Sequence, residues 1–414
     1  MNDWAGWLLV DSSFLILLAS ATIRRRMAAF LAAVFTLIAH QCVALINTYG
    51  VTIKGAESDA VTFHALAAEM SALSNIDWIF TVDAAMYVQF LALFYKHLGA
   101  SKLLGSQLSL VAFAVSIILI AKIADQLSLR RYTPGLILLA GLLPSVAIFT
   151  SVTLRESYQL CFFLLFAHST LLVRKRPRFG NVITLLLALF GLSLMHKGLA
   201  AMSLVFLVLA AYWSTRGGRG WSAKVRRYFV LFVAGMAISA WIYASARFGI
   251  GVGAFLTDGL PAYVYSYRQG LSDYLTMRAS YGPIVTSPTA GAVLVSLPLI
   301  GLLYMFAPFP AQVENALDIY ALLEGFLRLI LLLFAFGALR RSTGELRSRI
   351  GFLFMIFCLI EVMWALGTSN WGQAIRHHVV AYPILVLLGG PGLIRFLVSA
   401  SRGLLQPFPS RDPD

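Results

Sequence analysis

Long apolar runs alternate with short polar segments along almost the whole chain. Most runs approach the roughly 17–25 residues that an α-helix needs to cross the ~30 Å hydrocarbon core of a membrane. The alternating segments of about ten residues that a membrane β-barrel requires are absent from the sequence. We therefore predict an all-α, polytopic transmembrane protein. Ten spans are expected, at residues 27–47, 103–125, 134–150, 157–173, 181–195, 198–213, 228–247, 318–339, 350–366 and 379–398.

Two further apolar segments leave the predicted total at ten or eleven spans. Residues 5–22 are interrupted by an aspartate and two serines, so they either cross the membrane or lie along it. Residues 291–310 contain three prolines, which favours a re-entrant or surface-lying segment within an external loop, 248–317. Residues 399–414 are expected to be a cytoplasmic tail. Residues 1–414 thus form a single transmembrane domain.

The first long polar break, residues 48–102, follows the span that leads out of the cytoplasm and is unusually acidic. Within it, 59–73 has apolar residues at helical spacing, with Ser58 or Asp59 as a possible N-cap. Residues 84–98 are apolar but would be only about 22 Å long as a helix. Counting 84–98 as a span would place later basic clusters outside the cell. We predict two juxtamembrane helices on the extracytoplasmic surface.

Composition supports a membrane protein and explains the charge. Hydrophobic residues make up 59% of the chain and charged residues 12%, while the net charge is +14. Most of the basic residues stand in short clusters between apolar runs, as expected of cytoplasmic connections. This distribution does not indicate nucleic-acid binding. The three cysteines lie within apolar runs without metal-ligand spacing.

The remaining polar clusters collect on the predicted extracytoplasmic side. Charged groups close to the hydrocarbon are energetically costly and commonly mark a substrate path. These clusters are Glu57 and Asp59; Arg155 and Glu156; His196 and Lys197; Arg268 and Arg278; and Arg376, His377 and His378.

Asp59 is the candidate general base. A carboxylate on a surface helix can accept the proton of an acceptor hydroxyl as that oxygen forms a new bond. The structural alternative is an N-cap, and one residue can do both. Glu57 could share the catalytic role, bind a cation, or be an ordinary solvated charge.

Arg155, His196 and Lys197 are candidates for holding phosphate. Arginine binds phosphate oxygens bidentately, and Glu156 could orient the neighbouring Arg155. His196 and Lys197 interrupt two apolar runs, where lysine can neutralise a diphosphate and histidine can donate a hydrogen bond to it. The alternatives are a structural ion pair at a helix end and an interfacial hairpin with a snorkelling lysine.

Two further clusters complete the predicted binding site. Arg268 and Arg278 are interleaved with tyrosines, a mixture that suits a glycan or lipid-diphosphate groove but also a membrane-interface aromatic belt. Arg376 is a candidate ligand of the leaving phosphate, with His377 beside it. A metal pair of His377 and His378 is not expected, because adjacent residues of a helix point apart. No cofactor is predicted; a divalent cation is possible but not indicated.

The order of these parts resembles the GT-C superfamily of membrane glycosyltransferases, which use polyprenyl-phosphate-linked sugars. The shared features are an outward first span, an acidic residue in the first external loop (Asp59), and juxtamembrane helices after it. The segment 87–99 looks like the second of these helices. Pro144 to Glu156 is similar to the family's external turn with a proline followed by a charged residue. The stretch Glu57-Ser58-Asp59 stands where protein mannosyltransferases have an Asp-Glu dipeptide.

Other motifs resemble the Wzy-type polymerases of bacterial surface polysaccharides. They are Leu154-Arg155-Glu156-Ser157, His196-Lys197-Gly198, Pro308-Phe309-Pro310 and Asn370-x-Gly372-x-x-x-Arg376-His377.

These resemblances imply an extracytoplasmic, inverting glycosyl transfer. Asp59 would deprotonate the acceptor, and the polyprenyl phosphate or diphosphate would leave toward Arg155, Lys197 or Arg376. The implied partners are a polyprenyl-linked sugar or glycan, a glycan or lipid acceptor, and membrane lipids, in the plasma membrane of a bacterium. The alternatives are a repeat-unit polymerase, a lipid-linked glycan transporter and a non-catalytic scaffold. The transporter is disfavoured because the sequence shows no repeat and no clear intramembrane charge cluster, Glu361 being the nearest exception.

Overall fold

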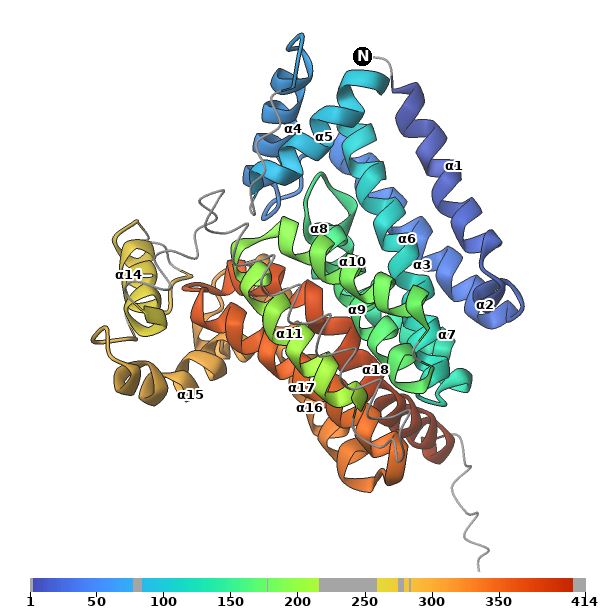
Figure 1. Cartoon of the computed structure of the whole chain (residues 1–414), viewed down its shortest axis with the longest axis vertical. Helices are drawn as coiled ribbons and strands as arrows, with labels where there is room; N and C mark the ends of the chain where they lie inside the picture. Colours follow the sequence, from blue (N-terminus) through green and yellow to red (C-terminus); the bar gives the residue numbers. More distant parts are fainter. Residues whose placement is uncertain are drawn as a thin grey trace, which may run out of the picture.

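A computed structural model describes residues 3–76, 84–176, 178–215, 259–274, 279–282 and 284–404. These residues form a bundle of helices (Figure 1), and the bridge between Ser280 and Asn370 is the only pairing of extended residues among them. The predicted span 228–247 and Arg278 lie outside the described residues.

The helices fall at or near the predicted apolar runs. Their bounds are α1 (Trp4–Ala19), α2 (Ala21–Arg24), α3 (Met27–Tyr49), α4 (Glu57–Ser71), α5 (Ala84–Leu98), α6 (Lys102–Gln126), η1 (Arg130–Tyr132), α7 (Thr133–Gly141), α8 (Pro144–Ser151), α9 (Glu156–Lys175), α10 (Phe179–Met195), α11 (Lys197–Thr215), α14 (Gly259–Tyr274), α15 (Ala290–Phe306), η2 (Pro310–Gln312), α16 (Ala316–Arg341), α17 (Gly344–Leu366) and α18 (Trp371–Leu404).

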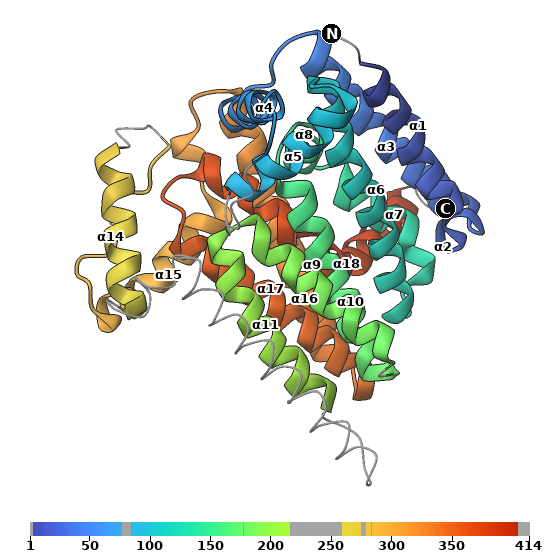
Figure 2. The same ribbon diagram turned by 45° about the horizontal axis from the view of Figure 1, so that its top comes forward.

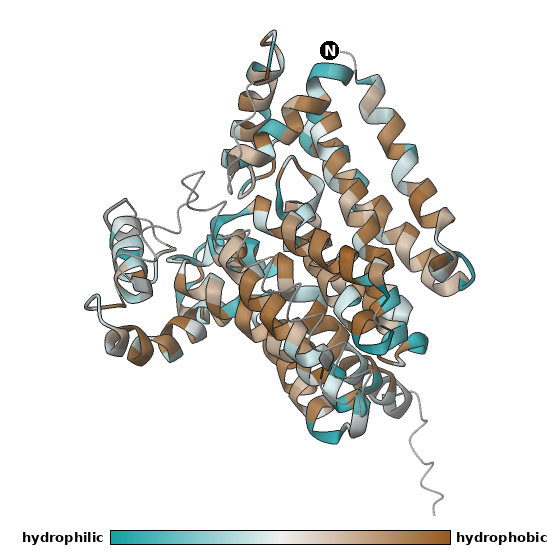
Figure 3. Cartoon of the chain, in the orientation of Figure 1, coloured by the Kyte–Doolittle hydropathy of each residue, from teal (hydrophilic) through white to brown (hydrophobic). Residues whose placement is uncertain are grey.

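Seven helices in the described part of the chain are long and apolar enough to cross a membrane: α3, α6, α9, α11, α16, α17 and α18. Figure 3 shows hydrophobic residues along the middle of the bundle and hydrophilic residues gathered toward its ends. The prediction of an all-α protein with several membrane spans is confirmed. Helices α1, α10 and α15 are apolar but shorter, with 16, 17 and 17 residues.

The predicted span at 134–150 is broken into two helices in the structure. The chain forms η1 and α7, breaks, and continues as α8 with a bend of 70°. Pro144 starts α8, and a proline disfavours helical backbone at the residue before it. Leu143 accordingly has extended backbone angles (φ −61°, ψ 130°), which end α7 and turn the chain.

The last two spans start earlier than predicted. Helix α17 begins at Gly344 rather than residue 350, and α18 begins at Trp371 rather than residue 379. The polar residues 376–378 therefore lie inside α18 and not before it. They can do so because each has a partner on a neighbouring helix or on the segment that joins α17 to α18, as described below.

The two helices that were predicted to be juxtamembrane, α4 and α5, lie beside each other at one end of the bundle (Figures 1 and 2). Helix α5 has the predicted bounds, whereas α4 starts at Glu57, so neither Ser58 nor Asp59 is its N-cap. Aromatic contacts join the two helices. The Phe63 ring meets Tyr87 edge-on at 5.4 Å, and His64 Nδ1 lies 2.9 Å from the Tyr95 hydroxyl oxygen.

Helix α15 covers residues 291–306 of the predicted re-entrant segment 291–310. Its last residue, Phe306, packs against Gly325 in the interior of α16, where an added Cβ would lie 3.1 Å from the Phe306 carbonyl oxygen. Residues 307–315 then lead from the level of Gly325 back to Ala316, where α16 begins. Whether this segment enters and leaves on one side of the membrane stays a prediction.

Helix α6 forms the centre of the N-terminal half and is buried along most of its length. Polar side chains join it to α3. Gln41 and Gln107 exchange two amide hydrogen bonds, of 2.9 and 2.7 Å. Paired amides of this kind hold helices together in an apolar surrounding because neither has water as an alternative partner.

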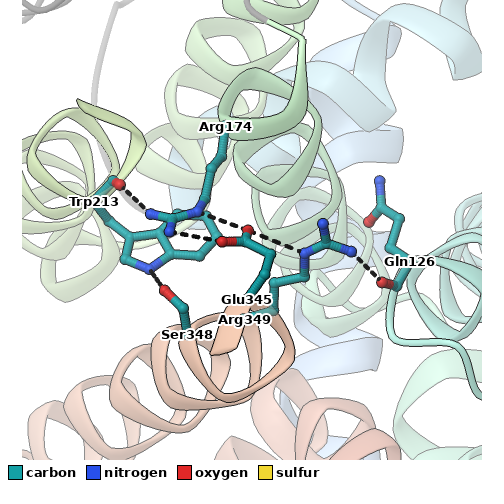
Figure 4. A network of polar contacts seen from close by, with 6 residues as sticks. All are labelled: Gln126, Arg174, Trp213, Glu345, Ser348 and Arg349. Carbon is teal, nitrogen blue, oxygen red and sulfur yellow. Dashed lines mark hydrogen bonds and ion pairs between the residues drawn. The ribbon is translucent and has the colours of Figure 1, made fainter. Parts of the chain in front are cut away.

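At the end of the bundle opposite α4, basic residues join four helices (Figure 4). Arg174 on α9 binds the Glu345 carboxylate with two 2.9 Å bonds and lies 4.2 Å over the Trp213 ring of α11. Arg349 on α17 also contacts Glu345, and it donates to the Gln126 carbonyl at the end of α6. We call this the basic end of the bundle, which is the predicted cytoplasmic end.

Candidate functional site

Three charged side chains from distant parts of the chain meet at the α4 end. Arg376 on α18 binds Asp59 of α4 through Nη1 and Glu156 of α9 through Nε, the latter at 2.5 Å. Glu156 is 3% exposed and Asp59 is 44% exposed. A single guanidinium thus bridges a buried carboxylate and a half-exposed one. Glu156 binds Arg376 in the structure, and its orientation of the neighbouring Arg155 stays a prediction.

The bridge leaves part of Asp59 open. The ion pair uses its Oδ2 atom, while Oδ1 has no partner among the described residues. Asp59 lies in the first turn of α4, where the helix dipole favours a carboxylate. This side chain is therefore oriented by Arg376 but still accessible to a ligand.

Arg155 lies beside this cluster, at the start of α9. Its Nη1 donates to the Met195 carbonyl at 3.1 Å, and its guanidinium lies 6.0 Å from the centre of the Phe63 ring of α4. Because Phe63 is itself held by Tyr87, helices α4 and α5 set the position of one wall of the site. Asp59 and Arg155 thus lie at the same end of the bundle, as predicted.

His196, between α10 and α11, belongs to the same cluster. The backbone N–H of Gly198 donates to its Nδ1 at 3.1 Å, so the proton of the neutral ring is on Nε2. Burial lowers the His196 pKa to about 3, and the charges of Arg155, Arg376 and Lys197 lower it in the same direction. His196 is thus a neutral hydrogen-bond donor among cations.

This low pKa predicts a pH effect on stability. The unfolded chain has the ordinary histidine pKa of about 6.5 and binds a proton that the folded chain rejects. Stability contributed by neutral His196 is therefore complete above pH 6.5 and is lost as the pH falls toward 3. Unfolding temperatures at pH 7, 6 and 5 should fall more in the wild type than in His196→Gln. The control is His97→Gln, at an exposed histidine of α5; equal losses in all three proteins would contradict the assignment.

His377 and His196 both contact the ring of Trp364. The His377 ring stacks on the Trp364 ring at 4.0 Å, and His196 meets the same ring edge-on at 4.7 Å. Thr368 donates its hydroxyl proton to the Trp364 carbonyl, so the 2.9 Å contact with His377 has Nδ1 of the histidine as donor. His377 is therefore committed to packing and is not free to bind phosphate through Nδ1.

Arg268 has a different role from the one predicted. It is 4% exposed, and its Nη1 lies 3.0, 3.4 and 2.9 Å from the carbonyl oxygens of Ala365, Leu366 and Thr368. It therefore caps the C-terminal end of α17, where a cation is favoured. This contact fixes α14 against the bundle.

Fixing α14 presents two tyrosines beside the site. The rings of Tyr263 and Tyr267 stack 6.0 Å apart with an angle of 17° between them, and Tyr267 is 44% exposed. Tyr267 also lies close enough to Arg155 for that charge to act on its hydroxyl. An exposed aromatic surface therefore borders the charged cluster.

The other predicted site residues are placed less closely. Glu57 is exposed in the first turn of α4 and forms no ion pair with a described residue. Lys197 is exposed at the start of α11, next to His196. Among the described residues there is no group of three or more histidine, cysteine or carboxylate side chains placed to hold a metal ion.

A second cluster lies inside the bundle, and only two of its members, Glu361 and His378, were named from the sequence. Glu324 on α16 accepts the Ser145 backbone N–H of α8 at 2.8 Å and lies 3.7 Å from Arg328. Arg328 is 1% exposed and donates to the Met305 carbonyl. The signal was present, because Glu324 and Arg328 stand four residues apart within a predicted span, and charges there are rare without a function.

Glu361 and His378 complete this intramembrane cluster. His378 Nδ1 lies 2.7 Å from the Glu361 carboxylate, and its Nε2 lies 3.0 Å from the Tyr304 carbonyl oxygen. The Tyr304 carbonyl oxygen can only accept, so Nε2 of His378 is the donor of that hydrogen bond. These four ionisable groups of α16, α17 and α18 thus form one buried cluster.

No protein-family profile, curated protein or solved structure matches the chain. Its class follows from the helices themselves: it is an α-helical integral membrane protein. Its more particular function is argued from the charged cluster at the α4 end.

Proposed function

We propose that this protein is a membrane glycosyltransferase that takes a sugar from a polyprenyl-phosphate or polyprenyl-diphosphate carrier on the extracytoplasmic side. The observation that supports this most is the meeting of Asp59, Glu156 and Arg376 from three distant segments, with one carboxylate oxygen of Asp59 left open. Arg155 and Lys197 add positive charge beside an acidic group. A general base next to a cationic surface is what transfer from a sugar phosphate requires.

In the proposed reaction, Asp59 accepts the proton of an acceptor hydroxyl. The hydroxyl oxygen forms a bond to the anomeric carbon of the donor sugar, and the bond from that carbon to the phosphate oxygen breaks. The leaving phosphate takes the electron pair. Arg155 and Lys197 stabilise its charge, and the neutral His196 donates a hydrogen bond through Nε2. The configuration of the sugar is inverted.

Arg376 has a changed role in this proposal. The sequence suggested it as a ligand of the leaving phosphate, but its charge is shared between two carboxylates. We infer that it positions Asp59. The aromatic surface of Tyr263 and Tyr267 fits the proposal as a place where a sugar ring stacks.

The intramembrane cluster favours one alternative, a transporter of lipid-linked glycans. Glu324, Arg328, Glu361 and His378 are ionisable groups buried among apolar helices, and such groups mark proton or substrate paths in transporters. A transporter would move the lipid-linked sugar intact, whereas a transferase would cleave it.

The two functions can be distinguished in liposomes. The purified protein is reconstituted with lipid-linked sugars extracted from the host membrane and labelled in the sugar. We expect labelled glycan and free polyprenyl phosphate or diphosphate to appear together, detected by mass spectrometry. Movement of intact label to the opposite leaflet, measured by its exposure to an added glycosidase, would support the transporter instead. If the reconstituted protein neither cleaves nor moves the lipid-linked sugar, both functions are contradicted.

A further inference from the structure

An open depression of about 470 Å³ lies at the basic end, between η1 and the last turns of α18. It is remote in the fold from the Asp59 cluster, which lies at the start of α18. Its lining residues are Arg131, Tyr132, Ile394, Arg395, Val398 and Ser399.

Two cations line this depression, and no carboxylate of the residues that the structure describes neutralises them. Arg131 and Arg395 are exposed and form no ion pair with a described residue. Other arginines at this end are paired, as Arg26 is with Asp125 and Arg174 is with Glu345. The two cations on one small concavity repel each other, and a bound anion would relieve that repulsion.

Local contacts hold both arginines in place. Arg131 donates to the Tyr132 hydroxyl at 2.5 Å and lies 4.6 Å from the centre of that ring. Arg395 Nε donates to the Pro391 carbonyl at 3.2 Å, which leaves its two terminal nitrogens for a ligand. Because the Tyr132 oxygen accepts from Arg131, its own O–H can donate to the same ligand.

The wall of the depression is apolar. Ile394 packs against Gly135 of α7, where an added Cβ would lie 2.7 Å from its Cδ1, so the glycine lets α7 and α18 approach closely. Val398 continues this wall and is 46% exposed, and the neighbouring Phe396 and Leu397 are 58% and 55% exposed. A free phosphate would leave this surface unused, but a phosphate with an acyl chain would cover it.

We propose that the depression binds an anionic phospholipid. The headgroup phosphate would lie between Arg131 and Arg395 with the Tyr132 hydroxyl as a further donor, and an acyl chain would follow Ile394 and Val398. Basic pockets between helices at a membrane interface are suited to such headgroups. The proposal is independent of the glycosyl-transfer reaction.

The test compares lipid binding by the full chain with that of two double variants. The proteins compared are delipidated wild type, Arg131→Gln/Arg395→Gln and the control Arg24→Gln/Arg347→Gln. Both double variants lose two positive charges at the same end of the bundle, and Arg24 and Arg347 are exposed like the two residues tested. Each protein is titrated in detergent with phosphatidylglycerol or phosphatidylcholine and analysed by native mass spectrometry and by thermal unfolding.

We expect the wild type and the control to prefer phosphatidylglycerol, and the Arg131/Arg395 variant to bind it about 30-fold more weakly, from the usual contribution of two arginines to headgroup attraction. An equal loss in the control, or no preference in the wild type, would overturn the proposal. If inorganic phosphate alone raises the unfolding temperature of the wild type as much as phosphatidylglycerol does, the depression binds a free anion, and the lipid assignment is overturned. If the double variant does not fold, Arg395→Gln is compared with Arg347→Gln under the same criteria.

Discussion

Asp59→Asn is expected to lower the rate of glycosyl transfer by about 10²–10⁴-fold while the protein stays folded. An amide is nearly isosteric with the carboxylate but cannot accept the acceptor proton. The Asp59 side chain is 44% exposed, so losing its ion pair with Arg376 should change stability little. The measurement is the initial rate of lipid-linked sugar consumption in liposomes, together with the unfolding temperature.

The matched control is Glu57→Gln. Glu57 lies in the same turn of α4, carries the same charge and is exposed, but it forms no ion pair with a described residue. It should keep a rate within a few-fold of the wild type. If both variants lose activity equally, the loss follows from removing negative charge in the first turn of α4 rather than from removing a base at Asp59. A fully active Asp59→Asn would exclude Asp59 as the base.

Arg376→Met should be the most destabilising single change at this end of the bundle. It leaves Glu156, which is 3% exposed, as an uncompensated buried charge, and removing one partner of a buried ion pair costs about 3–5 kcal/mol. Methionine keeps much of the side-chain volume, so the effect measures charge rather than a cavity. Equilibrium unfolding of the purified protein in mixed micelles gives the free energy of unfolding.

A double variant separates stability from the transfer reaction. In Arg376→Met/Glu156→Gln the buried charge is gone, so most of the lost stability should return. Glycosyl transfer should not return, because Asp59 is no longer held by Arg376. If transfer and stability recover together, Arg376 acts only as a structural partner of Glu156. If neither recovers, the destabilisation has a cause other than the buried charge.

The sequence predicted which candidate residues lie at the same end of the bundle better than it predicted their partners. Asp59, Arg155, Glu156, His196 and Arg376 were selected because they are polar residues on the predicted external side, and the structure brings them to one end of the bundle. Their partners were less predictable. Arg376 binds residues 220 and 317 positions away in the chain, so no local spacing reports the contact.

Arg268 and His377 illustrate the limit of reading function from residue type. Both were candidates for holding phosphate, yet Arg268 caps α17 and His377 packs on Trp364. A buried arginine or histidine forms its hydrogen bonds with the acceptors that the fold places beside it, as Arg268 does through Nη1. For Arg268 these acceptors lie at the C-terminal end of α17, which was predicted correctly at residue 366, whereas His377 lies inside α18 because that helix starts at Trp371 rather than residue 379.

The sequence by itself determined the class of the protein and the ends of the bundle. Insertion of each apolar run depends on that run's own transfer from water to lipid, and the basic clusters mark one side, so both properties are local. The tertiary structure decided the bend at Pro144, the bridge through Arg376 and the buried cluster around Arg328. These depend on which faces of the helices meet. In a membrane helix the lipid-facing and protein-facing sides are both apolar, so the pattern of hydrophobic positions does not reveal the contact face.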